Sequence, residues 1–177
     1  MNRRPPCGGF TLIELLVVLV VIGVVVASIQ LNLFSDDARR LRNEGERLAA
    51  LLTALADETV TSGMPLAVSF SETGYAFWQR DDDTSGPPAQ TREGRWRTRP
   101  GDELFAGRQM PEGIRIAEVR IRQRPLARSE KTPERVVFSP AGMHPPFSVL
   151  LALGDLRVRV VSDALGNLRV EDDADEP

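Results

Sequence analysis

Residues 7–29 read CGGFTLIELLVVLVVIGVVVASI, and this stretch decides how the N-terminal part of the chain is organised. The 20 residues from Phe10 to Ile29 contain one charged side chain, that of Glu14. An α-helix needs about 20 mainly apolar residues to cross the hydrocarbon core of a bilayer. The stretch therefore predicts a membrane-spanning helix with a single carboxylate near its N-terminal end.

The small residues of this stretch precede the apolar run. Gly8 and Gly9 lie between the basic pair Arg3-Arg4 and the run, whereas a secretory signal peptide has its small-residue cleavage site after the apolar core. Cleavage between Gly9 and Phe10 would remove a short leader and leave the hydrophobic helix on the mature chain. The alternative is an uncleaved signal anchor whose glutamate reaches the membrane surface.

The order GFTLIELLVVLVVIG resembles the N-terminus of type IV pilins and type II secretion pseudopilins. The resemblance implies that a prepilin peptidase cuts after Gly9, that the same enzyme N-methylates Phe10, and that Glu14 acts in assembly. A charged side chain at membrane depth costs about 2.5–3.5 kcal/mol on insertion scales unless a partner neutralises it. The new α-amine of Phe10, on the same or a neighbouring subunit, is a suitable partner for Glu14.

The charges of the chain predict its orientation and exclude some partners. Basic residues on the short flank predict a cytoplasmic N-terminus, so residues after about 31 would face the exterior, which is the periplasm in a two-membrane bacterium. The chain has 22 basic and 25 acidic residues, and loss of Arg3 and Arg4 leaves 20 basic residues and a formal charge of −5. No global basic excess favours nucleic acid. The only cysteine, Cys7, leaves with the leader, so the mature chain has no internal disulfide.

After the apolar run the sequence becomes amphipathic, which predicts that the helix continues into a folded domain. The residues at helical spacing are Leu41, Leu48, Leu52, Leu55 and Thr59, and charged residues occupy other positions. Ser35-Asp36-Asp37 could instead cap a second helix. Gly63 and Pro65 predict the end of the helix, through a left-handed cap and a residue that cannot continue it.

Beyond residue 65 the pattern predicts short antiparallel strands joined by turns. The expected strands are 66–70, 75–79, 114–122 with a bulge near 117–118, 135–138, 147–153, 156–162 and 168–170. Residues 80–101 are expected to form an exposed loop and residues 171–177 an acidic frayed end. The predicted class is α+β, with a long N-terminal helix packed on an antiparallel β-sheet head. The predicted parts are a cleaved leader (1–9), a transmembrane assembly helix (10–31), an amphipathic helix (32–63) and a β-rich periplasmic head (64–177).

A second resemblance lies in ERVVFSPAGMHPPFSVLLAL (134–153) and LRVRVVSDALGNLRV (156–170). These stretches are similar to the C-terminal region of the H-type minor pseudopilin of type II secretion, a GspH/FimT-like member of the type IV pilin superfamily. The residues that carry the match are Phe138, Pro140, Gly142, Pro146 and Phe147. The alternative is a FimT- or FimU-like minor pilin of type IV pili, acting in pilus priming or DNA uptake. Those relatives often have cysteines here, and this chain has none.

The second resemblance implies a structural role and a set of partners. It implies a subunit at or near the tip of a short periplasmic pseudopilus that supports export of folded proteins across the outer membrane. The implied partners are other minor pseudopilins, the major pseudopilin, the prepilin peptidase, the inner membrane and secreted exoproteins. The implied location is the bacterial inner membrane, as a single-pass protein with its head in the periplasm.

Other signals do not favour catalysis, so no enzyme, metal or cofactor is expected. His144, the only histidine, is expected to be a loop residue, and a metal site needs further donors. Asp81-Asp82-Asp83 lacks the glycine and glutamate of a calcium loop. Basic residues around Trp96 and along 115–128 could contact nucleic acid, but a solvated strand face and loop are the expected reading.

Overall fold

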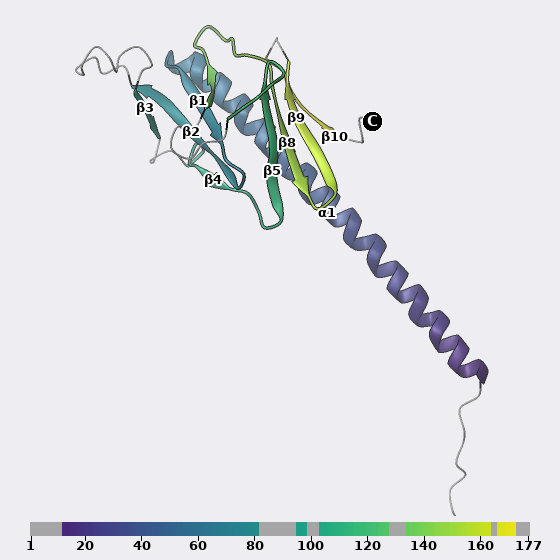
Figure 1. Ribbon diagram of the computed structural model, residues 1–177. Helices are drawn as coiled ribbons and strands as arrows, with labels where there is room; N and C mark the ends of the chain where they lie inside the picture. Colours follow the sequence, from purple (N-terminus) through teal and green to yellow (C-terminus); the bar gives the residue numbers. More distant parts are fainter. Residues whose placement is uncertain (1–11, 82–94, 99–102, 128–133, 164–165, 173–177) are drawn as a thin grey trace, which may run out of the picture. The chain divides into compact units, whose positions relative to one another are not determined.

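The computed structural model describes residues 12–81, 95–98, 103–127, 134–163 and 166–172 and, within these, every side chain except those of residues 25–35, 81 and 95. The chain divides into two compact units, Met1–Ala38 and Arg39–Pro177. Figure 1 labels the elements along the chain. They are α1 (Leu12–Ser62), β1 (Leu66–Phe70), β2 (Gly74–Asp81), β3 (Arg95–Thr98), β4 (Arg108–Gln109), β5 (Ile114–Ile121), β6 (Arg124–Pro125), β7 (Arg135–Phe138), β8 (Phe147–Leu153), β9 (Leu156–Ser162) and β10 (Leu168–Asp172).

Helix α1 is one element of 51 residues. A second helix capped at Ser35-Asp36-Asp37 is not found, because the helical assignment runs through these residues without a break. The helix ends at Ser62, and Gly63 follows with a φ of 68°. This left-handed glycine, with Pro65 two residues later, confirms the predicted cap.

The strands form two antiparallel sheets. The first has the order β3-β2-β1-β7, with β4 also paired to β2, and the second has the order β10-β9-β8-β5-β6. The predicted hairpins are present: β1 pairs with β2, and β8 pairs with β9 around Gly154, whose φ is 57°. The predicted bulge is also present, as a register shift between Ile116 and Glu118.

Two expectations about irregular segments are wrong. Residues 95–98 are not part of a loop, because they form β3, in which Trp96 lies opposite Arg80 of β2. Alternation of Trp96 and Thr98 with arginines is compatible with a strand, but the surrounding Asp, Gly and Pro residues hid this signal. The chain also does not fray at residue 171, because β10 extends to Asp172. Residues 80 and 81 are not part of the loop either, because β2 extends to Asp81. The rest of the predicted loop, 82–94 and 99–101, lies outside the described residues.

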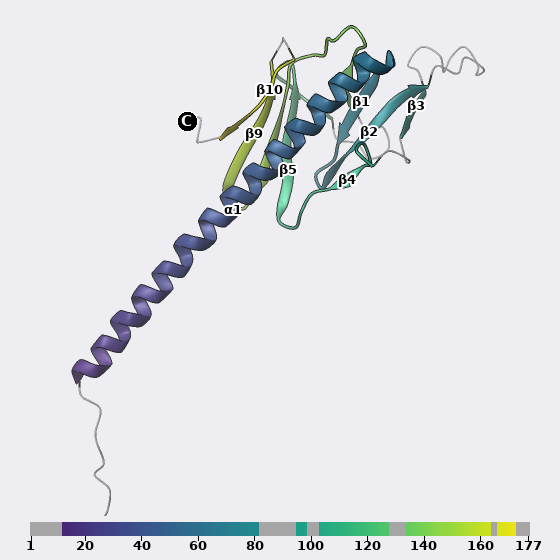
Figure 2. The ribbon, with the colours of Figure 1, turned by 180° about the vertical axis from the view of Figure 1, so that it is seen from behind.

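Residues 39–62 of α1 cover one face of both sheets (Figure 2). The predicted stripe is confirmed: Leu41, Leu48, Leu52 and Leu55 are fully buried. Thr59 is buried too, and its hydroxyl donates to the carbonyl of Leu55 at 2.7 Å. Burying one leucine side chain contributes about 1.5–3 kcal/mol. Both sheets contribute buried side chains to this core, among them Val68, Phe77, Val136, Phe138, Ile116, Val149, Leu151 and Val160.

Gly45 allows the helix to approach the second sheet closely. A Cβ atom at this position would lie 3.0 Å from Cγ1 of Val158 on β9 and 3.4 Å from Cγ1 of Val170 on β10. The first distance is below ordinary van der Waals separation. Glycine at position 45 therefore sets how closely α1 packs against β9 and β10.

Candidate assembly site

The N-terminal candidates for processing and assembly are Gly9, Phe10 and Glu14. Gly9 and Phe10 lie outside the described residues. Glu14 lies in the first turn of α1, where the positive end of the helix dipole favours a carboxylate. Its described neighbours are strongly exposed: Leu12 is 84% exposed and Ile13 70% exposed. One carboxylate therefore lies among apolar side chains that the other described residues leave exposed.

The apolar surface around Glu14 continues along the helix. Large apolar side chains are exposed from Leu12 to Val24, and an apolar surface of this extent marks contact with a membrane or with another protein. Among the residues that the structure describes, no helix is both long and apolar enough to span a bilayer.

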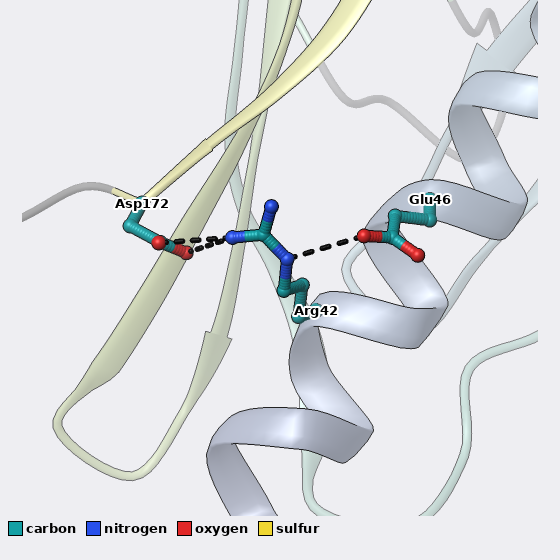
Figure 3. A network of polar contacts seen from close by, with 3 residues as sticks. All are labelled: Arg42, Glu46 and Asp172. Carbon is teal, nitrogen blue, oxygen red and sulfur yellow. Dashed lines mark hydrogen bonds and ion pairs between the residues drawn. The ribbon is translucent and has the colours of Figure 1, made fainter.

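The end of β10 is tied to α1 by a group of charged side chains (Figure 3). Arg42 donates from Nη1 to Oδ1 and Oδ2 of Asp172 at 3.0 and 2.9 Å, and from Nε to Oε1 of Glu46 at 3.1 Å. The three side chains are about half exposed or more, so each pair contributes about 0–1 kcal/mol. The contact specifies where the last strand meets the helix more than it stabilises the fold.

Glu44 and Tyr75 are buried polar residues that the sequence analysis did not single out. Glu44 is 7% exposed and Tyr75 is 4% exposed. Among the described residues, Oε1 of Glu44 and the hydroxyl of Tyr75 have no hydrogen-bond partner. The signal for Glu44 was its spacing, three residues after Leu41 and four before Leu48, which places it on the apolar face. Burial, and secondarily the Glu44 carboxylate, raises the pKa of Tyr75 above its ordinary 10.0 against the opposing effects of Arg108 and Arg47.

We expect stability to fall as the pH rises above about 10, because an unfolded tyrosine ionises near that value. In the folded chain Tyr75 stays neutral until the pH passes its raised pKa, so over this window the unfolded state gains charge first and is favoured. Tyr75 is the only tyrosine, so tyrosinate absorbance of the full chain in non-ionic detergent reports it alone. The midpoint should lie above 10 in the folded chain and near 10 in concentrated guanidinium chloride.

The Tyr75→Phe variant is the control for this titration, since it removes the absorbance change while keeping the buried ring. The free energy of unfolding of this variant should fall less steeply above pH 10 than that of the wild type, because the variant has no tyrosine to ionise. A folded-state midpoint at or below 10 would contradict the buried, neutral Tyr75.

Both tryptophans of the chain lie on the first sheet, close to the guanidinium of Arg135. The Cζ atom of Arg135 lies 4.4 Å from the ring centroid of Trp78 and 5.8 Å from that of Trp96. The indole Nε1 of Trp78 donates to Oγ of Ser69 at 2.8 Å. Burial lowers the pKa of Arg135. Trp96 therefore packs beside a basic residue of its own fold.

His144 packs against two aromatic rings of the core, which also contact each other. Its ring centroid lies 4.7 Å from that of Phe138 and 5.6 Å from that of Phe147. Two residues that carried the second resemblance thus hold the histidine. In the part of the chain that the structure describes, no three His, Cys, Asp or Glu side chains gather in a way that could hold a metal ion.

Comparison with known proteins finds an N-terminal sequence motif and two curated relatives. Residues 4–29 match the family described as "Prokaryotic N-terminal methylation motif". Type II secretion system protein H of Aeromonas hydrophila is 26% identical over 190 aligned positions that cover 98% of each chain. The protein of the same name from Pseudomonas aeruginosa is 37% identical over 75 residues, 42% of this chain and 44% of its own.

Solved structures share the fold. The minor pseudopilin EpsH of the Vibrio cholerae type 2 secretion system matches with a TM-score of 0.57 at 18% identity, over 77% of this chain and 99% of its own. The solution structure of E. coli GspH matches with a TM-score of 0.60 at 20% identity, over 79% of this chain and 94% of its own. At such identity these two likenesses concern the fold alone.

Proposed function

We infer that the chain is an H-type minor pseudopilin of the type II secretion system. This inference rests on two findings in one chain. Residues 4–29 match an N-terminal methylation motif, and the chain is similar to a type II secretion system protein H over 98% of both sequences. The helix packed on two antiparallel sheets, shared with EpsH and GspH, agrees with it.

We propose that a prepilin peptidase cleaves between Gly9 and Phe10 and methylates the amine of Phe10. The motif at residues 4–29 supports this proposal, as does the position of both glycines before the apolar run. The processed chain keeps its apolar helix, anchors in the inner membrane as a single span and places its β-rich head in the periplasm. The exposed apolar side chains from Leu12 to Val24 support this anchoring.

In the assembled pseudopilus, Glu14 pairs with the methylated amine of Phe10 on a neighbouring subunit. The glutamate lies in the first turn of α1 among exposed apolar side chains, so packing helices side by side would surround its carboxylate with hydrocarbon. An axial stagger of neighbouring helices brings an amine to it and avoids an unpaired charge, which costs about 2.5–3.5 kcal/mol. The pair thereby sets the register between subunits.

Glu14→Ala is expected to be cleaved and inserted normally but to enter the pseudopilus about tenfold less than the wild type. The reason is that the variant lacks the carboxylate that pairs with the Phe10 amine, and about 1.4 kcal/mol corresponds to a factor of ten. The measurement is the amount of variant in sheared, sedimented filaments relative to membranes, at native expression. Glu46→Ala, which removes an exposed glutamate of the same helix, is the control. Incorporation of Glu14→Ala at the wild-type level would refute the pairing.

We further propose that the subunit lies at or near the tip of the pseudopilus and supports export of folded proteins across the outer membrane. Its partners there are other minor pseudopilins and the major pseudopilin. Cross-linking in living cells, followed by mass spectrometry of the captured proteins, tests this placement. Capture of minor pseudopilins in excess over the major one supports the tip, whereas capture of the major pseudopilin alone would place the subunit along the shaft.

A further inference from the structure

The face of the second sheet that α1 does not cover is basic. The helix passes behind the strands in Figure 1 and in front of them in Figure 2, so β5, β8 and β9 present their other face away from the helix. On β5 and β9, four arginines occupy positions between the buried residues, namely Arg115, Arg120, Arg157 and Arg159. Arg169 of β10 lies opposite Val161 of β9 and adds a fifth arginine to the same face. The same strands carry two glutamates there: Glu118 pairs with Arg120 at 2.8 Å and Glu171 with Arg169 at 2.7 Å. Positive charge therefore prevails on this face, in a chain whose formal net charge is −3.

One end of this face is hollowed. A depression of about 540 Å³ lies where β5 ends and β8 begins, with Arg120, Arg122 and Arg159 around it and Val161 among its lining residues. Ligand sites typically have volumes of about 300–1,000 Å³ and combine apolar lining with a few polar groups. The strand register explains the gathering: Arg120 lies opposite Ser148, and Ser148 lies opposite Val161.

The backbone beside the depression is strained. Arg122 and Gln123 form the two-residue turn between β5 and β6, with φ values of 49° and 70°. Two consecutive residues with positive φ are typical of a type I′ hairpin turn, in which Asn-Gly is strongly preferred. The Arg122 amide donates to the carbonyl of Pro146 at 2.9 Å and holds the turn against the start of β8. Arg122 and Gln123 are less favourable in such a turn than Asn-Gly, but they place two long polar side chains at the depression. Backbone strain of this kind is found preferentially at functional sites.

We propose that this depression binds an acidic peptide segment of a partner protein. Guanidinium groups match carboxylates through paired hydrogen bonds, and the partly exposed Val161 offers an apolar contact beside the acid. The volume of this open depression suits a few side chains. Glu118 and Glu171 interrupt the arginines and would repel a continuous polyanion, and the net negative charge of the chain does not steer nucleic acid toward it. Charge complementarity therefore favours a peptide with spaced carboxylates.

The test uses the full chain in non-ionic detergent and a fluorescein-labelled peptide of alternating glutamate and leucine, measured by fluorescence anisotropy. A peptide with glutamine in place of glutamate and a short labelled single-stranded DNA are the competing probes. We expect the acidic peptide to bind about tenfold more tightly than either probe, with an affinity that falls with added salt.

Two variants localise the site without relying on loss of folding. Arg122→Asn/Gln123→Gly installs the preferred turn and should raise the melting temperature while weakening the acidic peptide about tenfold. Arg159→Gln should weaken it similarly. Arg115→Gln, on the same face but away from the depression, should leave binding unchanged. Equal binding of the glutamine peptide, preference for DNA, or undiminished binding by the turn variant would each overturn the proposal.

Discussion

Replacing Gly9 with valine is expected to leave almost all of the chain unprocessed. Glycine presents no side chain next to the bond between Gly9 and Phe10, whereas valine adds a branched Cβ and restricts the backbone on which cleavage depends. The N-terminal amine would then stay at Met1, and no methylated Phe10 amine would be available to Glu14. Intact-mass spectrometry of the membrane-extracted chain should find residues 1–9 still attached.

Gly8→Val is the matched control, since it adds the same bulk one residue before the proposed cleavage position. We expect this variant to be processed, and its mature mass to equal that of the methylated wild-type chain. Cleavage of Gly9→Val at the wild-type level would contradict the proposed site, and so would a mature terminus at any residue other than Phe10.

Phe77→Ala is expected to destabilise the head by about 3–5 kcal/mol, the usual range for truncating a buried phenylalanine. Phe77 is 1% exposed, on the helix-covered face of β2. Its ring meets Tyr75 edge-on at a centroid distance of 5.6 Å and Phe105 at 5.4 Å. The truncation therefore leaves a cavity and removes two aromatic contacts. The measurement is the free energy of unfolding in guanidinium chloride, followed by tryptophan fluorescence of the full chain in detergent.

Val137→Ala is the control for this cavity, because Val137 is 39% exposed on β7 of the same sheet. A surface truncation of this kind should change the free energy of unfolding by about 0.5 kcal/mol or less. A loss below about 1 kcal/mol for Phe77→Ala would show that the head does not have the aromatic core described above.

Local patterns predicted much of the head correctly. The leucine stripe from Leu41 to Leu55 was visible because helical periodicity places its members on one face, and all four leucines are fully buried. Gly63 and Gly154 marked their turns because left-handed backbone favours glycine, and both have positive φ. The bulge between Ile116 and Glu118 was visible as a slip in the alternation of apolar residues.

Features that depend on pairing distant segments could not be predicted in this way. The pairing of β1 with β7 joins Leu66 to Phe138, and nothing in either strand specifies that partner. The division of the strands into two sheets depends on such long-range pairings. For the same reason, the sequence did not indicate that Arg120 and Arg159 border one depression. Glu44 was missed because its charge suggested a solvated position, although its spacing placed it on the buried face.

In the candidate assembly site, too, the local motif was visible in the sequence, whereas the partner of its carboxylate was not. Gly9, Phe10 and Glu14 were chosen from a local motif, and all three lie within residues 4–29, which match the methylation-motif family. The partner proposed for Glu14 lies on a neighbouring subunit, so the local motif alone does not specify the pair. The structure adds that Glu14 lies in the first helical turn with apolar neighbours exposed around it.

The most direct test of the central claim, that the chain is a minor pseudopilin of type II secretion, is deletion of its gene in the native host. The measurement compares the amounts of secreted exoproteins in culture medium and periplasm, alongside surface pili and DNA uptake. The account predicts that exoproteins accumulate in the periplasm while pili and transformation stay normal, and that the wild-type gene restores secretion. Normal secretion with lost pili or transformation would contradict it and identify a minor pilin of type IV pili instead.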